Sequence, residues 1–123
     1  MTAFAKCRIK GPKAEEFLDK LVANKLPKKI GRINLCHALN TKGGVHSEFT
    51  IMRESENSFY LVSAGAFQRL DHDWIYKWMP KDGSVQFENL TNSIGVLVVS
   101  GPKARELMQR VSKTDFSNEK FKW

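Results

Sequence analysis

The residues best suited to chemistry lie just beyond the Gly-Gly turn of the segment NTKGG, in a run where polar and apolar residues alternate. In such a run successive side chains point to opposite faces, so Glu48 shares one face with His46 and Thr50. A carboxylate there can project into a pocket and accept a hydrogen bond from an N–H group of a ligand. The alternative is a solvated glutamate on the outer face of a sheet. The pattern alone leaves both hypotheses open.

Other common kinds of site are not supported by the residue spacing. A phosphate-binding loop of the type GxxxxGK[ST] opens a helix, whereas NTKGGV leads into an expected strand. The histidines, His37, His46 and His72, lack the spacing that lets three or four ligands converge on zinc, so no metal site is expected. The sequence also contains no GxSxG nucleophile turn and no GxGxxG motif for a flavin.

The charge of the chain is concentrated near its beginning. The formal net charge is +7, and residues 1–45 carry ten Lys or Arg against three acidic residues. The densest part is KLPKKIGR, with Lys25, Lys28, Lys29 and Arg32 in an expected loop. Such a cluster could attract a carboxylated ligand or nucleic-acid phosphate, although a solvated surface is the simpler explanation. Nucleic acid is the weaker alternative, because the aromatic residues are not interleaved with basic ones as in an RNA-binding strand.

The length and composition are typical of a single globular domain. Hydrophobic residues make up 41% and charged residues 27% of the chain. The sequence has no apolar run of about 18 residues and no secretory signal pattern at its start, so no membrane association and a cytoplasmic location are expected. Cys7 and Cys36 have no CxxC partner, which predicts two reduced thiols.

A repeated motif organises the elements that would position Glu48. The segments KGPKAEEFLDKL and SGPKARELMQRV both place Gly-Pro-Lys-Ala between a strand-like run and an amphipathic helix. Between them, the pattern predicts three antiparallel strands, a helix over 66–79 and a strand over 84–90, with a further strand over 94–100 before the second motif. The predicted fold is α+β, in the order β-α-β-β-β-α-β-β-α, with about three helices on a largely antiparallel sheet.

The last residues, TDFSNEKFKW, are unusually aromatic for a tail. Phe116, Phe121 and Trp123 predict an apolar surface that needs a cover. We expect this surface to drive self-association, most simply into a two-fold dimer.

Five segments in order carry a resemblance to a known family: GPKAEEFLDKLVANKLPKKIGR, LNTKGGVHSEFTI, FYLVSAG, HDWI and FENLTNSIGVLVVSGPKARELMQRV. Together they resemble the folate-binding aminomethyltransferase domain. The likeness is strongest to the version in the C-terminal part of dimethylglycine and sarcosine dehydrogenases, which is related to the glycine-cleavage T-protein. Residues 1–123 would form a single domain, the N-terminal portion of this folate-binding unit.

The resemblance implies a site for tetrahydrofolate. Glu48 stands where the family has an acidic residue that contacts the pterin, so it is the expected catalytic and folate-orienting group. Ser63 stands where T-protein-like sequences have an asparagine, and Asn40 and His46 are the other expected cofactor contacts. The implied reaction passes a methylene group from glycine or an N-methylated glycine to tetrahydrofolate, with a flavoprotein dehydrogenase as a partner.

The later GExGWE segment and arginine that help to enclose folate in the family are not in this sequence. The chain alone is therefore expected to bind tetrahydrofolate weakly and to lack a complete active site. A non-catalytic interaction or ligand-sensing module with the same fold is the alternative function, and a basic nucleic-acid-binding module is the second alternative.

Overall fold

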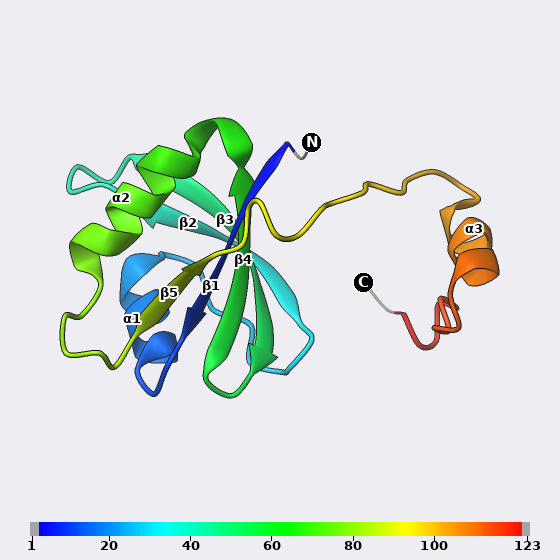
Figure 1. Cartoon of the computed structure of the whole chain (residues 1–123), viewed down its shortest axis with the longest axis horizontal. Helices are drawn as coiled ribbons and strands as arrows, with labels where there is room; N and C mark the ends of the chain where they lie inside the picture. The colour runs from blue at the N-terminus through cyan, green and yellow to red at the C-terminus, as the bar shows by residue number, and fades with distance from the viewer. Residues whose placement is uncertain (1–2, 122–123) are drawn as a thin grey trace.

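A computed structural model describes residues 3–121 of the chain. Figure 1 shows a sheet with two helices against it and a third helix at a distance. The elements, in chain order, are β1 (Phe4–Lys10), α1 (Ala14–Leu21), β2 (Ile33–Leu39), β3 (Val45–Ser55), β4 (Ser58–Ala64), the 3₁₀ turn η1 (Gly65–Phe67), α2 (Gln68–Trp78), β5 (Gln86–Asn89) and α3 (Ala104–Val111).

The sheet confirms the predicted α+β class. Its strand order is β2-β3-β4-β1-β5, and every neighbouring pair is antiparallel. The core lies on one face of the sheet, where α1 and Ile75 of α2 pack against alternate residues of the strands. The buried strand residues are Cys7, Ile9, Cys36, Ala38, Phe49, Ile51, Phe59 and Leu61. Both helices therefore cover the same face of the sheet. The strand residues that alternate with these buried ones point their side chains to the opposite face.

The edge strand β2 buries its smaller side chains and exposes its larger aliphatic ones. Cys36 and Ala38 face the core, whereas Ile33 and Leu35 are 55% and 52% exposed. The larger aliphatic side chains are thus on the outer face, because the register with β3 places Cys36 opposite the core residue Phe49.

The predicted hairpin between β2 and β3 is confirmed. Its turn is closed by the Asn40 side chain, whose Oδ1 accepts hydrogen bonds from the backbone N–H groups of Lys42 (2.9 Å) and Gly44 (3.1 Å). Gly43 has a φ of +81°, a conformation that favours glycine. The register shifts between Ala38 and Leu39, which leaves His46 as the bulged residue of β3.

The two Gly-Pro-Lys-Ala motifs adopt the same local structure. Gly11 and Gly101 have φ values of +129° and +119°. Each glycine carbonyl accepts a 3.0 Å hydrogen bond from the N–H of the alanine three residues later, Ala14 or Ala104. Both helices begin at that alanine, because the glycine and proline form the preceding turn.

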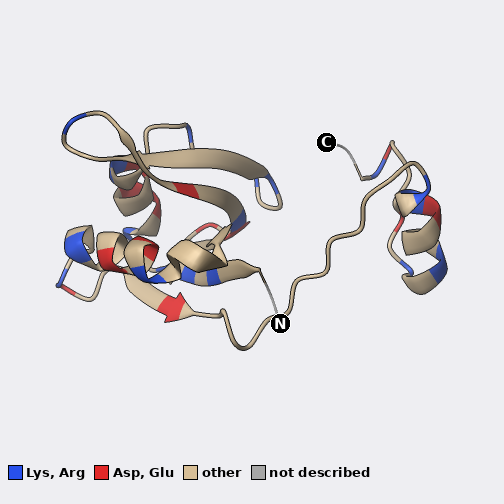
Figure 2. Ribbon diagram, turned by 90° about the horizontal axis from the view of Figure 1, so that it is seen from above, with Lys and Arg blue, Asp and Glu red and all other residues tan. Residues whose placement is uncertain are grey.

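The surroundings of the two motifs differ. The region of α1 is buried in the core, whereas α3 lies apart from the sheet in both views of the molecule (Figures 1 and 2). The strand predicted over 94–100 is extended but is not part of the sheet, and Leu97 and Val98 are 93% and 74% exposed. That expectation was wrong in detail because a strand requires a neighbour to pair with, and no described segment lies beside this one. Of the predicted tail cluster, Phe116 and Phe121 contact each other with ring centroids 5.2 Å apart, and Trp123 lies outside the described residues.

Candidate functional site

A cavity of about 440 Å³ lies where β3 begins and β4 ends. Its polar lining comprises His46, Ser47, Glu48, Thr50, Ser63 and Asp71. The rest of the wall is mostly apolar, with Phe4, Val62, Phe67 and Leu70 among its residues. The fold thus brings Glu48, Ser63 and His46, three of the four predicted cofactor contacts, into one cavity of a size typical of ligand sites.

The Glu48 carboxylate is held at one of its two oxygens. Its Oε2 lies 3.0 Å from Nε2 of His37, the residue directly opposite it on β2. His37 is oriented in turn by Asn24, whose Oδ1 accepts the His37 backbone N–H at 3.0 Å and lies 3.4 Å from the ring Nδ1. The Glu48 side chain is 62% exposed, so its other oxygen remains accessible to a ligand.

The role of His37 was missed by reading the histidines for metal spacing. The hairpin pattern alone does not reveal this pairing. Counting outward from the Leu39–Val45 pair places His37 opposite Ser47, and only the bulge at His46 brings it opposite Glu48, where side chains on the same face touch.

His46 and Asn40 occupy different settings. The bulge directs the His46 ring onto the indole of Trp74 in α2, with centroids 4.0 Å apart and planes 23° from parallel. Its Nδ1 also lies 2.8 Å from Oγ of Ser47. His46 therefore joins β3 to α2 at the cavity wall, whereas Asn40 closes the hairpin turn outside the lining.

Asp71 is an ionisable residue of the cavity that no motif in the sequence indicated. It is only 3% exposed, although it is a carboxylic acid in the first turn of α2. Burial and, secondarily, the charge of Asp71 raise the pKa of the Cys7 thiol on β1 to about 12. Helical spacing could have indicated the burial of Asp71, because this residue stands four positions before the core residue Ile75 and four after Phe67, on the same face of the helix.

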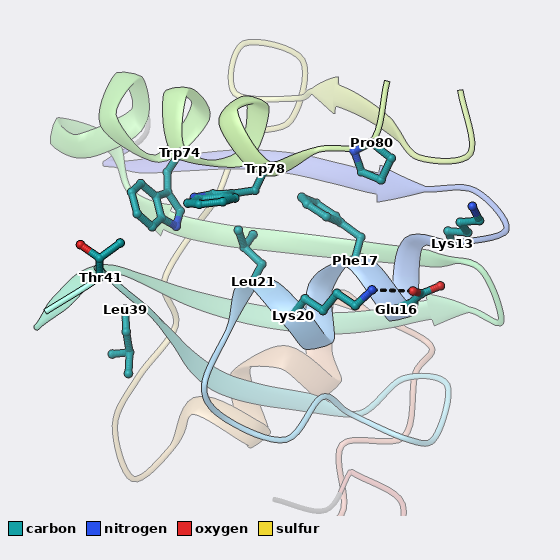
Figure 3. A pocket seen from close by; sticks show the side chains of 10 residues that line it. All are labelled: Lys13, Glu16, Phe17, Lys20, Leu21, Leu39, Thr41, Trp74, Trp78 and Pro80. Carbon is teal, nitrogen blue, oxygen red and sulfur yellow. Dashed lines mark hydrogen bonds and ion pairs between the residues drawn. The ribbon is translucent and has the colours of Figure 1, made fainter. Parts of the chain in front are cut away.

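A second cavity, of about 500 Å³, lies between α1 and α2 (Figure 3). Trp74 and Trp78 form one wall, and Phe17 and Leu21 of α1 face them. On its rim, Lys20 binds Glu16 at 2.6 Å, and Lys13 binds Asp82 at 3.2 Å. Since these charged groups already have partners, this cavity offers a polar ligand less than the first one does.

The basic segment of the sequence is a loop between α1 and β2. Arg53, which is 7% exposed, donates to the carbonyl oxygens of Pro27 and Lys28 at 3.3 Å and to the carboxylate of Glu15. This contact holds the pKa of the Glu15 carboxyl below its usual value. None of the four basic residues that define the cluster lines either of these two cavities. Basic and acidic residues are interspersed over the body of the molecule (Figure 2).

Residues 3–121 offer neither a metal site nor a membrane-spanning helix. Within residues 3–121, no group of three His, Cys, Asp or Glu side chains could hold a metal ion. Among the helices of the same range, none is long and apolar enough to cross a membrane.

Comparison with known proteins identifies the family. A model described as GCVT N-terminal domain matches residues 1–123. The chain is 36% identical over 124 aligned positions to human mitochondrial dimethylglycine dehydrogenase, a match that covers 100% of this chain and 14% of that protein. It is also 36% identical over 118 positions to an aminomethyltransferase of Thermoanaerobacter sp. (strain X514), covering 92% of this chain and 31% of that protein.

A solved structure agrees at the level of the fold. The crystal structure of glycine cleavage system aminomethyltransferase T from Bartonella henselae superposes with a TM-score of 0.75 at 22% identity, over 89% of this chain and 30% of that one. The chain thus spans less than a third of the length of these relatives. Because the family model matches its whole length, the chain belongs to the GCVT N-terminal domain family, as an aminomethyltransferase-type domain related to dimethylglycine dehydrogenase.

Proposed function

We propose that this chain is the tetrahydrofolate-binding part of an aminomethyltransferase-type domain in one-carbon transfer from glycine or an N-methylated glycine. The observation that carries the proposal is the placement of Glu48. Its carboxylate is anchored by His37 at one oxygen and lines a cavity of about 440 Å³ together with Ser63.

The residues of the cavity fit a folate head group. A carboxylate oxygen can accept hydrogen bonds from the N–H groups of a pterin, and a serine hydroxyl can donate or accept one. The apolar walls from Phe4, Val62 and Phe67 would exclude water from a flat ring. Folate, when bound, supplies the nitrogen that receives the one-carbon unit.

Glu48 has an electrostatic role in this proposal. A one-carbon unit released from a methylated amine passes through a cationic, iminium-like state. A carboxylate held in place before the reaction stabilises such charge without having to reorganise. The enzyme class that must supply this unit is an oxidising one, so a flavoprotein dehydrogenase is the proposed partner.

The test is calorimetric titration of the protein with tetrahydrofolate. Glu48→Gln is expected to weaken binding by roughly 10-fold or more, the effect of about 1.5 kcal/mol for a hydrogen bond to a charged group. Glu56→Gln is the matched control, because Glu56 is an exposed glutamate in the turn between β3 and β4. Equal affinities for Glu48→Gln and the wild type would contradict the assignment of Glu48. Absence of binding by the wild type would favour the non-catalytic interaction module.

A further inference from the structure

Asp71 is a buried carboxylate without a hydrogen-bond or ion-pair partner among residues 3–121. It lines the cavity beside β3 and β4 and is 3% exposed. No hydrogen bond or ion pair joins its side chain to another residue in the range 3–121, whereas the neighbouring acid Asp73 lies within 4.0 Å of Arg69. A buried carboxylate without a partner is costly, so native proteins normally pair it.

Among the described residues, the cavity is lined by two carboxylates, Asp71 and Glu48, and by no lysine or arginine. The buried Lys6 lies next to Cys7 on β1, so its side chain leaves the strand on the face opposite to that of Cys7. Its Nζ donates to the carbonyl oxygen of Phe4 at 2.8 Å. The nearby His72 is disfavoured as a cation, because burial lowers its pKa.

We infer that Asp71 is the counter-ion for a positively charged, N–H-bearing nitrogen of the ligand, that is, a protonated secondary or tertiary amine. A neutral folate head would satisfy one carboxylate, and the second calls for positive charge. The inference deepens the proposed function and rests on it for the identity of the amine: Glu48 binds folate, and Asp71 binds the amine whose methyl group the proposed flavoprotein partner oxidises to give the one-carbon unit. Retaining an unpaired charge in the free protein at the expense of stability is common at binding sites.

This inference predicts an unusual effect of substitution on stability. Asp71→Asn removes a buried charge and keeps the size of the side chain, so the ligand-free variant should melt higher than the wild type. The expected rise is about 4 to 8 °C, the shift that roughly 1 kcal/mol gives in a domain of this size. The matched control is Asp73→Asn on the same helix, where the side chain is 73% exposed and the melting temperature should change little.

The ligand class is tested with dimethylammonium chloride as the probe, against sodium chloride at the same ionic strength. Amide resonances of Ser47, Ser63 and residue 71 should shift in the wild type and in Asp73→Asn. The apparent affinity should fall at least 10-fold in Asp71→Asn.

The outcomes separate this inference from the proposed function. An Asp71→Asn protein that melts lower than the wild type, or does not fold, would overturn the inference, since the carboxylate would then be bound within the fold. Unchanged dimethylammonium shifts in Asp71→Asn, or no shifts in the wild type, would overturn it as well. Tetrahydrofolate binding without a dimethylammonium response removes only the inference, and the reverse result removes only the proposed function.

Discussion

The repeated Gly-Pro-Lys-Ala motif offers a matched pair of substitutions, Gly11→Ala and Gly101→Ala. Both glycines have a φ near +120°, which side chains other than that of glycine rarely adopt. A Cβ added at Gly11 would lie 2.3 Å from the carbonyl oxygen of Ser84 and 3.3 Å from Cα of Val85. A Cβ added at Gly101 would meet nothing within 4 Å. The backbone strain is therefore shared, and the clash belongs to Gly11 alone.

The expected loss of stability follows from these two terms. An unfavourable φ costs about 1 to 3 kcal/mol. At Gly11 the backbone of Ser84 must also move, which disturbs the buried Val85 and adds about 1 to 3 kcal/mol for overpacking. Gly11→Ala should thus lower the free energy of unfolding of the sheet and its two helices by about 4 kcal/mol. Gly101→Ala should change it by less than about 0.5 kcal/mol, because α3 lies apart from them.

The assay is urea unfolding followed by tryptophan fluorescence, since Trp74 and Trp78 lie in α2 against the body. Equal losses in the two variants would contradict this prediction. A loss of less than about 1 kcal/mol in Gly11→Ala would contradict it as well, because the backbone around Ser84 would then move aside at little cost.

Four further predictions concern other features of the molecule. Arg53→Met should lower the free energy of unfolding in urea by about 2 to 3 kcal/mol, because it removes the donor from the buried carbonyl oxygen of Pro27 and leaves the Glu15 carboxylate with Lys28 alone. The pKa of the Cys7 thiol is raised from 9.0 to about 12 in the folded state. The contribution of this thiol to the free energy of unfolding is therefore complete below about pH 9 and is lost as the pH rises toward 12. Unfolding free energies measured across this window should fall by about 1.4 kcal/mol per pH unit, and Cys7→Ala should flatten the slope. His37→Phe should weaken tetrahydrofolate binding several-fold in calorimetry, because the carboxylate of Glu48 loses its 3.0 Å contact with the imidazole. The free energy of unfolding in urea should change by less than about 1 kcal/mol. The wild type should self-associate in light scattering over a tenfold dilution series, and Leu97→Lys should abolish this association, since Leu97 is 93% exposed in an unpaired extended segment. A wild-type monomer at every concentration would contradict this expectation.

Several parts of the fold were predictable because they depend on local interactions. The helical spacing after each Gly-Pro-Lys-Ala corner, the hairpin closed by Asn40 and the alternation along β3 all follow from residues a few positions apart. The same alternation placed Glu48 on the face opposite to that of Phe49, and the structure confirms this difference in burial. The family resemblance drew on the order of such local segments along the chain.

What remained hidden in the sequence depends on contacts between distant segments. The run over 94–100 has the composition of a strand, yet a strand exists only where another one pairs with it, and none of the described segments does so. Which side of β2 is buried was decided by its register with β3 and by the helices that cover that face.

The candidate site shows the same division. The sequence by itself determined that a glutamate follows the Gly-Gly turn and that α2 carries acids among its apolar residues. Only the tertiary structure decided that His37 anchors Glu48 and that Asp71 is buried in the cavity wall, with no partner among residues 3–121. The physical reason is that burial and charge pairing depend on the packing of a whole helix against a sheet, which no short stretch of sequence specifies.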